Sequence, residues 1–519
     1  MNVDVIIVGF GPTGVTLAAL LGQRGIRVAA FDKLPSLYPL PRAIGLDHEV
    51  MRIAQELGVA EKVLEHTAAY RPSEYRGMEG QLIKRLDMAP PPFRLSWAPN
   101  YVFDQPAFEG VLRDRVSELE TVQVHLEADV TAQGQDADSA WVDVRLKGSD
   151  AQTRFTGKYL IACDGGASPI RTRLDISLED LKFHEPWLVV DAIVNDEKLA
   201  DLPQTQVQYC EASRPSTFVV LPGNHRRWEI MLLEGDSLSS DFPDEELWPL
   251  LERWITPKDG KIWRAAAYRF HGLVAQEWRR GRILLAGDAA HMTPPFMAQG
   301  MVQGLRDAQN LAWKLERVLG GSSPATFLDT YQQERRPHVV ETTLTAIELG
   351  RVICERDPEL ARQRDRRLVA EQGGQVRTMA RQNMIPPLKF GLLAEGSPGA
   401  GLLFPQPNVK TPKFEGRLDD LSGRGIRVAV LGQLDPIHET QLHGLLELCG
   451  GALIHFGSSV PANPNTIQVE EVESVMSTWL ASLDRSVVIG RPDNYVYGTA
   501  KTPADAVAML QQLLRSLTA

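Results

Sequence analysis

At 519 residues the chain is too long for one hydrophobic core and predicts roughly two to four domains. Hydrophobic residues make up 43% of it and charged residues 23%, which is typical of ordinary soluble globular proteins. The formal charge of −11 is spread without a block of like charge, so nothing in the sequence suggests nucleic acid or an anionic membrane as a partner. The composition favours a small molecule.

The N-terminus and the cysteines further restrict the class of protein. A strand pattern begins by Val3, with no basic segment or cleavable apolar stretch before it, and no run approaches the roughly 18 apolar residues of a membrane span. A cytoplasmic protein is therefore the default expectation. The four cysteines are far apart and form neither CxxC nor a metal-type Cys/His spacing, which predicts reduced thiols and no metal.

The first motif lies in residues 3–33, VDVIIVGFGPTGVTLAALLGQRGIRVAAFDK. A buried-strand run, a Gly-rich turn, a helical pattern and a second strand ending at Asp32 form a βαβ unit with GxGxxG. Gly9 suits the tight turn, Gly11 the approach of backbone to a pyrophosphate, and Gly14 close helix packing. The Asp32 carboxylate can accept hydrogen bonds from the two hydroxyl groups of a ribose. The unit predicts a dinucleotide site, against the alternative of a structural turn, but does not separate FAD from NAD(P).

No later strand runs into a second GxGxxG, and the Gly-rich segment 392–401 follows no strand and is typical of a linker. The sequence therefore predicts one permanent dinucleotide site. A nicotinamide cofactor, if used, would visit a shared cleft.

Three polar positions in the first third of the chain fit this site. Arg42 follows the second strand and could contact phosphate, and Gln105 precedes a helix that starts near Pro106 and could contact a ribose. Asp164 ends a buried strand, where open α/β sheets place ligand contacts. The alternatives are a surface cation for Arg42, a polar group at a helix start for Gln105 and an ordinary turn for Asp164.

Residues 122–130 and 141–148 alternate between apolar and polar side chains, which predicts a half-exposed antiparallel hairpin.

The predicted fold class is α/β, with a Rossmann-like domain that a mainly antiparallel sheet interrupts. Residues 1–174 form the first part of the dinucleotide-binding domain, 175–280 a substrate-binding sheet domain, 281–390 the second part with a helical connection, and 391–519 a linker and C-terminal domain. Residues 305–319 form a clear amphipathic helix, in which Leu305, Leu311, Trp313 and Leu315 are expected in the core.

Four landmarks occur in fixed order: GxGxxG with Asp32, Gln105 at a helix start, CDGGASPIR at 163–171, and AGDAAHMTPPFMAQGMVQGLRDAQNLAWKL at 286–315. Together they resemble the FAD-dependent single-component (class A) aromatic hydroxylases related to para-hydroxybenzoate and phenol hydroxylase. The motif sequences are most similar to those of the 3-(3-hydroxyphenyl)propionate hydroxylase group. That group shares PRAIG, CDGGAS, GDAAH and YQQERR, here at residues 41–45, 163–168, 287–291 and 331–336.

The C-terminal segments resemble the thioredoxin-like domain of the larger members of this family. They include residues 425–432, 486–496 and the closing helix 505–517. Because this domain lacks CxxC, we expect a structural or oligomer-contact role, which includes a homodimer, and no dithiol chemistry.

The resemblance implies tightly bound FAD, NADH or NADPH as a transient co-substrate, and O2. NAD(P)H would reduce FAD, O2 would form a C4a-hydroperoxide, and its terminal oxygen would pass to a phenolic ring such as that of a hydroxyphenyl carboxylic acid. Negative charge that develops on the reduced flavin would face a helix starting near Gly300. The residues implied to hold FAD are Gly9, Gly11, Pro12, Thr13, Gly14, Asp32, Lys33, Arg42, Gln105, Asp164, Gly165, Gly287, Asp288, Pro295, Gln299, Gly300 and Met301.

Two positions depart from the family pattern. Gly often stands where this chain has Ala298, and Asn often stands where it has Val302. Since that Asn helps to position the flavin ring, the contacts at the flavin carbonyl edge are open.

The substrate residues are less determined. A carboxylate tail calls for an Arg, and a phenol calls for a base or acceptor. Arg214, Tyr209 and Pro294 are substrate candidates, and His291 and Arg214 are catalytic candidates. The alternatives are a surface Arg and a histidine that packs the loop.

Two other functions stay open on sequence grounds. A flavin oxidase or dehydrogenase could use the same scaffold without inserting oxygen, and the chain could bind FAD without catalysis. A halogenase of this type would be expected to show a WxWxIP-like segment, which the sequence lacks.

Overall fold

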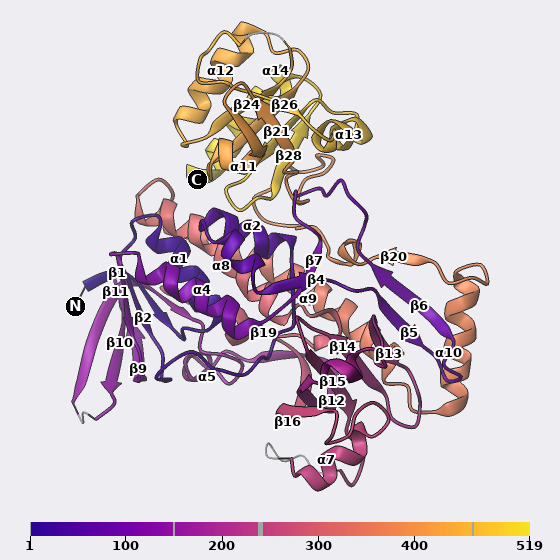
Figure 1. The fold of residues 1–519 in the computed structure, drawn as a ribbon. Helices are drawn as coiled ribbons and strands as arrows, with labels where there is room; N and C mark the ends of the chain where they lie inside the picture. Colours follow the sequence, from indigo (N-terminus) through magenta and orange to yellow (C-terminus); the bar gives the residue numbers. More distant parts are fainter. Residues whose placement is uncertain (1, 149–150, 237–241, 459–460, 519) are drawn as a thin grey trace.

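The computed structural model describes residues 2–148, 151–236, 242–458 and 461–518. Figure 1 shows an α/β domain that carries the N-terminus, a second sheet beside it, and a C-terminal domain that rests on the helical side of the first. Every helix among the described residues is too short or too polar to serve as a membrane span.

The first sheet is built on apolar parallel strands. β1 (Asn2–Val8) lies between β2 (Val28–Phe31) and β11 (Gln152–Ala162) and runs parallel to both. Val5, Ile6 and Ile7 are fully buried, as expected for a parallel sheet that is covered on both faces. The strand order is β17 (Arg279–Arg280), β18 (Ile283–Leu285), β11, β1, β2 and β8 (Val122–His125), with β10 (Ala140–Leu146) and β9 (Ala128–Gln135) added through β11.

The predicted hairpin of residues 122–130 with 141–148 is partly wrong. β8 lies parallel to β2, whereas β9, which starts at Ala128, pairs antiparallel with β10 as predicted. Alternation marks a half-exposed strand but does not identify its neighbour. After the segment of the second sheet, the chain returns to the first sheet with β18, which runs parallel to β11.

Helix α1 (Pro12–Gly22) packs between α4 (Gln105–Ser117) and α8 (Gly300–Leu319). Glycines allow the close approach: a Cβ on Gly304 would lie 2.2 Å from Thr13 Oγ1, and one on Gly14 would lie 2.0 Å from the Gly9 carbonyl oxygen. The predicted amphipathic helix is confirmed within α8, and its four expected core residues are buried.

The second sheet is the predicted antiparallel one, but it reaches beyond residues 175–280. It takes strands from both flanking parts of the chain, including β5 and β6 from the first third. The order is β19 (His291–Met292), β16 (Gly260–Ala275), β12 (Leu178–Val194), β15 (His225–Met231), β14 (Ser216–Val220), β13 (Gln206–Tyr209), β5 (Ser73–Arg76), β6 (Leu82–Asp87) and β20 (Thr378–Ala380).

Shorter elements join the two sheets. A small sheet contains β3 (Gly45–Asp47), β7 (Asn100–Phe103) and β4 (Thr67–Ala69). The remaining helices here are α2 (His48–Glu56), α3 (Ala60–Leu64), α5 (Pro169–Arg173), α6 (Asp196–Leu199), α7 (Asp244–Leu251), α9 (Asp329–Ile353) and α10 (Pro358–Glu371). Single 3-10 turns lie at Gly287–Ala289, Pro295–Met297, Ala325–Leu328 and Arg381–Met384.

The C-terminal domain has its own sheet, in which β23 runs parallel to β24 and antiparallel to β27. Its sheet order is β25 (Ile467–Gln468), β24 (Ala452–Phe456), β23 (Arg427–Leu431), β27 (Val487–Gly490) and β28 (Val496–Ala500). Its other elements are β21 (Asn408–Thr411), β22 (Phe414–Arg417), β26 (Glu470–Glu471), α11 (Leu418–Ser422), α12 (Pro436–Glu447), α13 (Val475–Ser482) and α14 (Pro503–Thr518). The thioredoxin-like assignment, the exact domain boundaries and the homodimer stay predictions.

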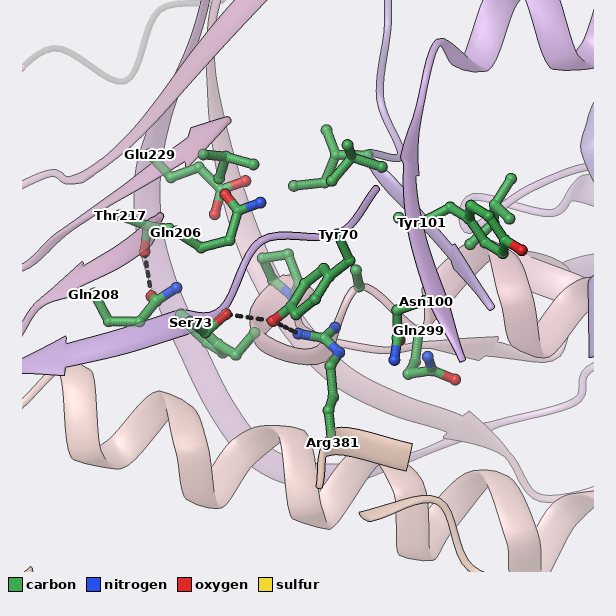
Figure 2. A pocket seen from close by; sticks show the side chains of 18 residues that line it. Tyr70, Ser73, Asn100, Tyr101, Gln206, Gln208, Thr217, Glu229, Gln299 and Arg381 are labelled. Atoms are coloured by element: carbon green, nitrogen blue, oxygen red, sulfur yellow. Dashed lines mark hydrogen bonds between the residues drawn. The ribbon is translucent and has the colours of Figure 1, made fainter. Parts of the chain in front are cut away.

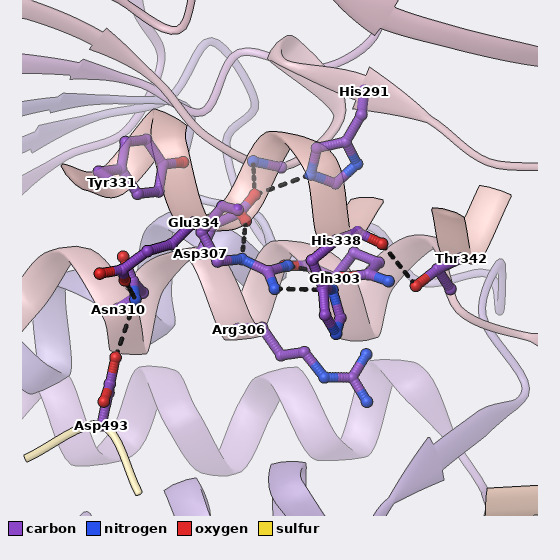
Figure 3. A network of polar contacts seen from close by, with 12 residues as sticks. His291, Gln303, Arg306, Asp307, Asn310, Tyr331, Glu334, His338, Thr342 and Asp493 are labelled. Atoms are coloured by element: carbon purple, nitrogen blue, oxygen red, sulfur yellow. Dashed lines mark hydrogen bonds and ion pairs between the residues drawn. The ribbon is translucent and has the colours of Figure 1, made fainter. Parts of the chain in front are cut away.

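Buried charges join the C-terminal domain to the first domain. Glu334 on α9 is fully buried and lies 2.6 Å from Arg491 and 2.7 Å from Lys314. Asp493, beside Arg491, accepts a hydrogen bond from Asn310 on α8 (Figure 3). Burial alone would raise the pKa of Glu334, but Arg491 and Lys314 hold it well below its ordinary value. The Glu334 carboxylate therefore stays ionised and fixes the domain contact.

We expect Glu334→Gln to lower the free energy of unfolding by about 3–5 kcal/mol, because it leaves two buried cations with Asp493 alone. The matched control is Glu341→Gln on the same helix, whose partly exposed pair with Lys389 contributes about 0–1 kcal/mol. Urea unfolding of both variants measures the difference. Equal midpoints for the two variants would contradict a stabilising role for the Glu334 cluster.

Candidate active site

A cavity of about 370 Å³ lies between the first domain and the second sheet. The Gly-rich turn lines it at one end through Gly11, Pro12 and Thr13. The segment that follows β18 supplies another wall, and the second sheet closes the side opposite the turn. The cavity therefore lies beyond the carboxyl ends of the parallel strands, where open α/β sheets bind ligands.

The Gly-rich turn has the backbone that a pyrophosphate site requires. Gly9 has a φ of +95°, and a Cβ there would lie 2.2 Å from the Cys163 carbonyl oxygen. A Cβ on Gly11 would meet no atom within 4 Å, so the backbone faces open space there. Helix α1 begins at Pro12, and the N–H groups of its first turn lack intrahelical partners. The turn can therefore receive a phosphate.

Asp32 lies beside this turn at the end of β2. One carboxylate oxygen accepts the Phe10 N–H at 2.7 Å, and the other accepts the Leu34 N–H at 2.9 Å. The acid and the Gly-rich turn are therefore in direct contact. Lys33 is exposed and lies outside the 370 Å³ cavity.

Gln105 and Arg42 both line the 370 Å³ cavity and are joined by a hydrogen bond. The buried Gln105 side-chain oxygen accepts the N–H groups of Arg42 at 2.9 Å and Ala43 at 2.6 Å. Gln105 thereby fixes the loop that presents the exposed Arg42 side chain. Both residues line the 370 Å³ cavity.

The CDGG segment contributes Cys163 and Gly165 to the cavity wall. Gly165 lines the cavity with a φ of +84°. Asp164 does not line it; one of its oxygens accepts the Ile170 N–H at 3.1 Å and caps the start of α5. Burial raises the pKa of Asp164.

Residues 287–304 lie against the cavity and are anchored from behind by Asp307 on α8. The carboxylate of Asp307 accepts the Gly287 N–H at 3.0 Å and lies 2.7 Å from His291 Nε2 and 2.8 Å from Arg335 Nε (Figure 3). Burial alone would raise the pKa of Asp307, but His291 and Arg335 lower it. His291 is fully buried, stacks on Trp278 and does not line the 370 Å³ cavity, so the structure gives it a packing position.

The cavity side of this segment is formed by its other residues. Asp288, Pro295, Gly300 and Met301 line the cavity, and Gly300 and Met301 belong to the first turn of α8. Dense protein surroundings raise the pKa of Asp288, although its side chain faces the open cavity.

The two departures from the family pattern lie differently. Ala298 has a φ of +51°, a conformation that favours glycine, and its methyl group lines the cavity wall. Val302 is fully buried in the core and does not line the 370 Å³ cavity. Of the two, Ala298 is thus the one that shapes the site.

A smaller cavity of about 60 Å³ adjoins the first one (Figure 2). The two share Ile44, Glu229, Pro295 and Ala298 as a common wall. Its polar lining comes from five separate parts of the chain, and consists of Tyr70, Ser73, Asn100, Tyr101, Gln206, Gln208, Thr217, Glu229, Gln299 and Arg381.

Two hydrogen-bonded groups order this polar lining. The Tyr70 hydroxyl lies 2.5 Å from Ser73 Oγ and accepts a bond from Arg381 at 3.1 Å. Thr217 donates to the Gln208 side-chain oxygen at 2.6 Å. Ring hydroxyls of a ligand could therefore meet donors and acceptors that are already oriented.

Gln299 lines the small cavity and a third, interdomain cavity of about 470 Å³, and not the 370 Å³ one, and its contact with FAD stays a prediction. Its side-chain oxygen accepts a bond from Arg306 at 2.7 Å, so its amide N–H2 group is left for a ligand. Arg306 also pairs with Glu49, which accepts a bond from Tyr495 of the C-terminal domain at 2.9 Å. The C-terminal domain thus reaches the wall of the small cavity.

The substrate candidates from the sequence do not meet at these cavities. Arg214 pairs with Asp236 at 2.6 Å, and Tyr209 packs on Trp254; neither they nor Pro294 line the 370 or 60 Å³ cavity. On β13, Gln206 and Gln208 face the small cavity, so strand alternation turns Tyr209 to the opposite face.

The sequence did not predict the polar lining of the small cavity, because these residues come from segments that lie far apart in the chain. Alternation in RRWEIM was the available signal: Arg227 and Glu229 point to the cavities, whereas Trp228 and Ile230 pack in the core behind the sheet.

These residues fit a flavin dinucleotide. The open backbone at Gly11 faces the cavity, the Asp32 carboxylate lies beside the same turn, and the first turn of α8 forms the far wall. Within the described residues, no group of three or more His, Cys, Asp or Glu side chains could hold a metal ion.

Comparison with known proteins agrees with this geometry. Residues 2–346 match the FAD binding domain family, and residues 401–516 match the HcaD C-terminal domain. A probable NADH-specific resorcinol 4-hydroxylase of Rhodococcus jostii (strain RHA1) is 36% identical, over 99% of this chain and 95% of that protein. The 3-(3-hydroxy-phenyl)propionate/3-hydroxycinnamic acid hydroxylase of Escherichia coli (strain K12 / DH10B) is 31% identical, over 96% of this chain and 92% of that protein.

Solved structures share the fold over the whole length. The flavin-dependent monooxygenase PieE, in complex with FAD and substrate, superposes with a TM-score of 0.81 at 18% identity and covers 100% of this chain and 99% of its own. Aklavinone-11 hydroxylase, with FAD and aklavinone, gives 0.79 at 19% identity and 99% coverage of both chains. The chain therefore belongs to the family of FAD-dependent aromatic hydroxylases built on this FAD-binding domain.

Proposed function

We propose that this flavin-dependent aromatic monooxygenase uses NADH and O2 to hydroxylate a compact phenol of the resorcinol type. The observation that carries the substrate class is the small polar cavity of about 60 Å³ beside the 370 Å³ cavity. The relative named for resorcinol and NADH supports the same choice. A benzenediol carries two hydroxyl groups and no charged tail, which suits a cavity lined by hydroxyls and amides.

The positions of the cations support a neutral substrate. Arg381, which lines the small cavity, already donates to the Met297 carbonyl oxygen and to the Tyr70 hydroxyl. Arg214, the sequence candidate for a carboxylate partner, lies elsewhere and is paired. A carboxylate tail such as that of 3-(3-hydroxyphenyl)propionate would have to extend past Arg381 into the 470 Å³ interdomain cavity.

In this proposal the 370 Å³ cavity holds the flavin. Asp32 and the Gly-rich turn bind the adenosine and pyrophosphate part, supported by Arg42 and Gln105. Asp288 contacts the ribitol region. Bound FAD supplies hydride acceptance from NADH and activation of O2 for transfer to the ring. The protein positions the ring, orients its hydroxyls and excludes water, while the first turn of α8 stabilises negative charge on the reduced cofactor.

The substrate class is tested by NADH oxidation with purified, FAD-loaded protein. We expect resorcinol to raise the oxidation rate at least about tenfold and to yield a trihydroxybenzene by mass spectrometry, with a higher kcat/KM than 3-(3-hydroxyphenyl)propionate. The reverse order of kcat/KM would assign the longer substrate. Equal turnover with no hydroxylated product would contradict the proposed monooxygenase reaction.

We expect Asp288→Ala to weaken FAD binding by about 10–100-fold, since a hydrogen bond to a charged group contributes about 1.5–3 kcal/mol. Isothermal titration of the apoprotein with FAD measures the change. Asp201→Ala is the matched control, because Asp201 is an exposed carboxylate that meets only Lys198 at 3.4 Å. Native FAD affinity in the Asp288 variant would contradict the placement of this segment at the ribitol.

A further inference from the structure

Glu229 lies in the wall that separates the 370 Å³ cavity, called the flavin-sized cavity below, from the small cavity. It lies on β15, and its side chain is on the cavity face of the second sheet, with 5% of the residue exposed. The other residues of the shared wall are Ile44, Pro295 and Ala298, so Glu229 is the one ionisable group that the described chain places there. A ring in the small cavity would meet it on the side that faces the flavin.

The Glu229 carboxyl has no hydrogen-bond partner in the part of the chain that the structure describes. Its nearest cation is Arg227, whose Nη1 lies 3.9 Å from Glu229 Oε1. Arg227 is itself held by Asp191, at 2.7 and 2.9 Å. A buried carboxyl without a hydrogen bond costs free energy, so its retention in a cavity wall indicates a ligand group that completes it.

The surroundings of Glu229 also set its proton affinity. Burial is the main cause that raises its pKa above the ordinary value, the negative charge of Asp191 on β12 adds to this, and Arg227 on its own strand opposes it. Two more charged residues line the flavin-sized cavity together with Glu229: Arg264 on β16, and Asp288 of residues 287–304, the flavin-facing segment. A carboxylate with a raised pKa is a stronger base, closer in proton affinity to a phenol.

Tyr70 is less suited to take a proton from the substrate. Its hydroxyl is already engaged by Ser73 and Arg381, and it lines the small cavity without reaching the flavin-sized one. In Figure 2, Glu229 lies across the cavity from Arg381 and Tyr70. The two sides therefore differ: one holds a free carboxyl, and the other a closed hydrogen-bonded group.

We propose that Glu229 is the catalytic base that accepts the proton of a ring hydroxyl when a phenol occupies the small cavity. The hydroxyl O–H bond breaks, the proton passes to a Glu229 oxygen, and the electron pair stays on the substrate oxygen. The resulting phenolate is richer in electrons at its ortho and para carbons, one of which receives the oxygen atom. Tyr70 and Arg381 then contact the second hydroxyl and orient the ring. This assignment rests on the proposed function.

The test uses FAD-loaded Glu229→Gln with resorcinol. We expect the variant to bind FAD and to be reduced by NADH, while hydroxylation slows by about 10²–10³-fold and the NADH consumed yields hydrogen peroxide. The difference spectrum of bound resorcinol should show phenolate in the wild type and neutral phenol in the variant. Glu185→Gln is the matched control, since burial raises the pKa of this carboxyl on neighbouring β12, but it lines neither cavity.

The pH profile separates a base from a merely structural carboxyl. Because Glu229 must be ionised to accept a proton, wild-type hydroxylation should rise with pH through its raised pKa, and the Glu229→Gln profile should lose that limb. Glu229→Asp, which keeps a carboxylate, should recover part of the rate and shift the limb. If Glu229→Gln fails to hold FAD, the presence or absence of the shift in Glu229→Asp decides the assignment.

The outcomes distinguish the two levels of the proposal. A wild-type enzyme that hydroxylates no phenol would overturn both the proposed function and this assignment. A wild-type enzyme that hydroxylates resorcinol, with a Glu229→Gln variant of the same product yield per NADH and the same pH profile, would overturn the role of Glu229 alone.

Discussion

The site depends on one buried carboxylate, that of Asp307. It accepts the N–H of Gly287 at the start of the flavin-facing segment, residues 287–304, and it is held from behind by Arg335 and His291. Because the pair of Asp307 and Arg335 is fully buried, removing Arg335 would leave an uncompensated charge, so the segment has little freedom to move. Gly287 of this anchored segment and Gly304 of α8 both pack closely against Thr13, so the anchor, α8 and the Gly-rich turn meet at one point.

The C-terminal domain is joined to α8 and α9 by further buried charges. Glu334, next to Arg335 in sequence, binds Arg491, while Tyr495 reaches Arg306 and Gln299 through Glu49. One short segment, 491–495, therefore joins the domain both to the packing of α9 and to the wall of the small cavity. This arrangement explains in physical terms why a domain without a CxxC dithiol is integrated with the active site.

The sequence predicted the parts of the molecule that depend on local signals. The βαβ unit, the contact of Asp32 with its Gly-rich turn and helix α8 all follow from short-range periodicity. It did not predict that β5, β6 and β20 join the second sheet, because pairing between distant segments leaves no local mark. Glu229 and Gln208 were missed for a related reason: alternation shows that they share a face, but not that this face lies over a cavity.

In the proposed function, the two adjoining cavities place an aromatic ring beside a flavin that inserts oxygen into it. Turnover of resorcinol and NADH under ¹⁸O2 tests this arrangement. We expect the hydroxylated product to carry one ¹⁸O atom per molecule. A product without label, or label found only in hydrogen peroxide and water while the substrate is oxidised, would contradict it and indicate an oxidase or dehydrogenase on the same scaffold.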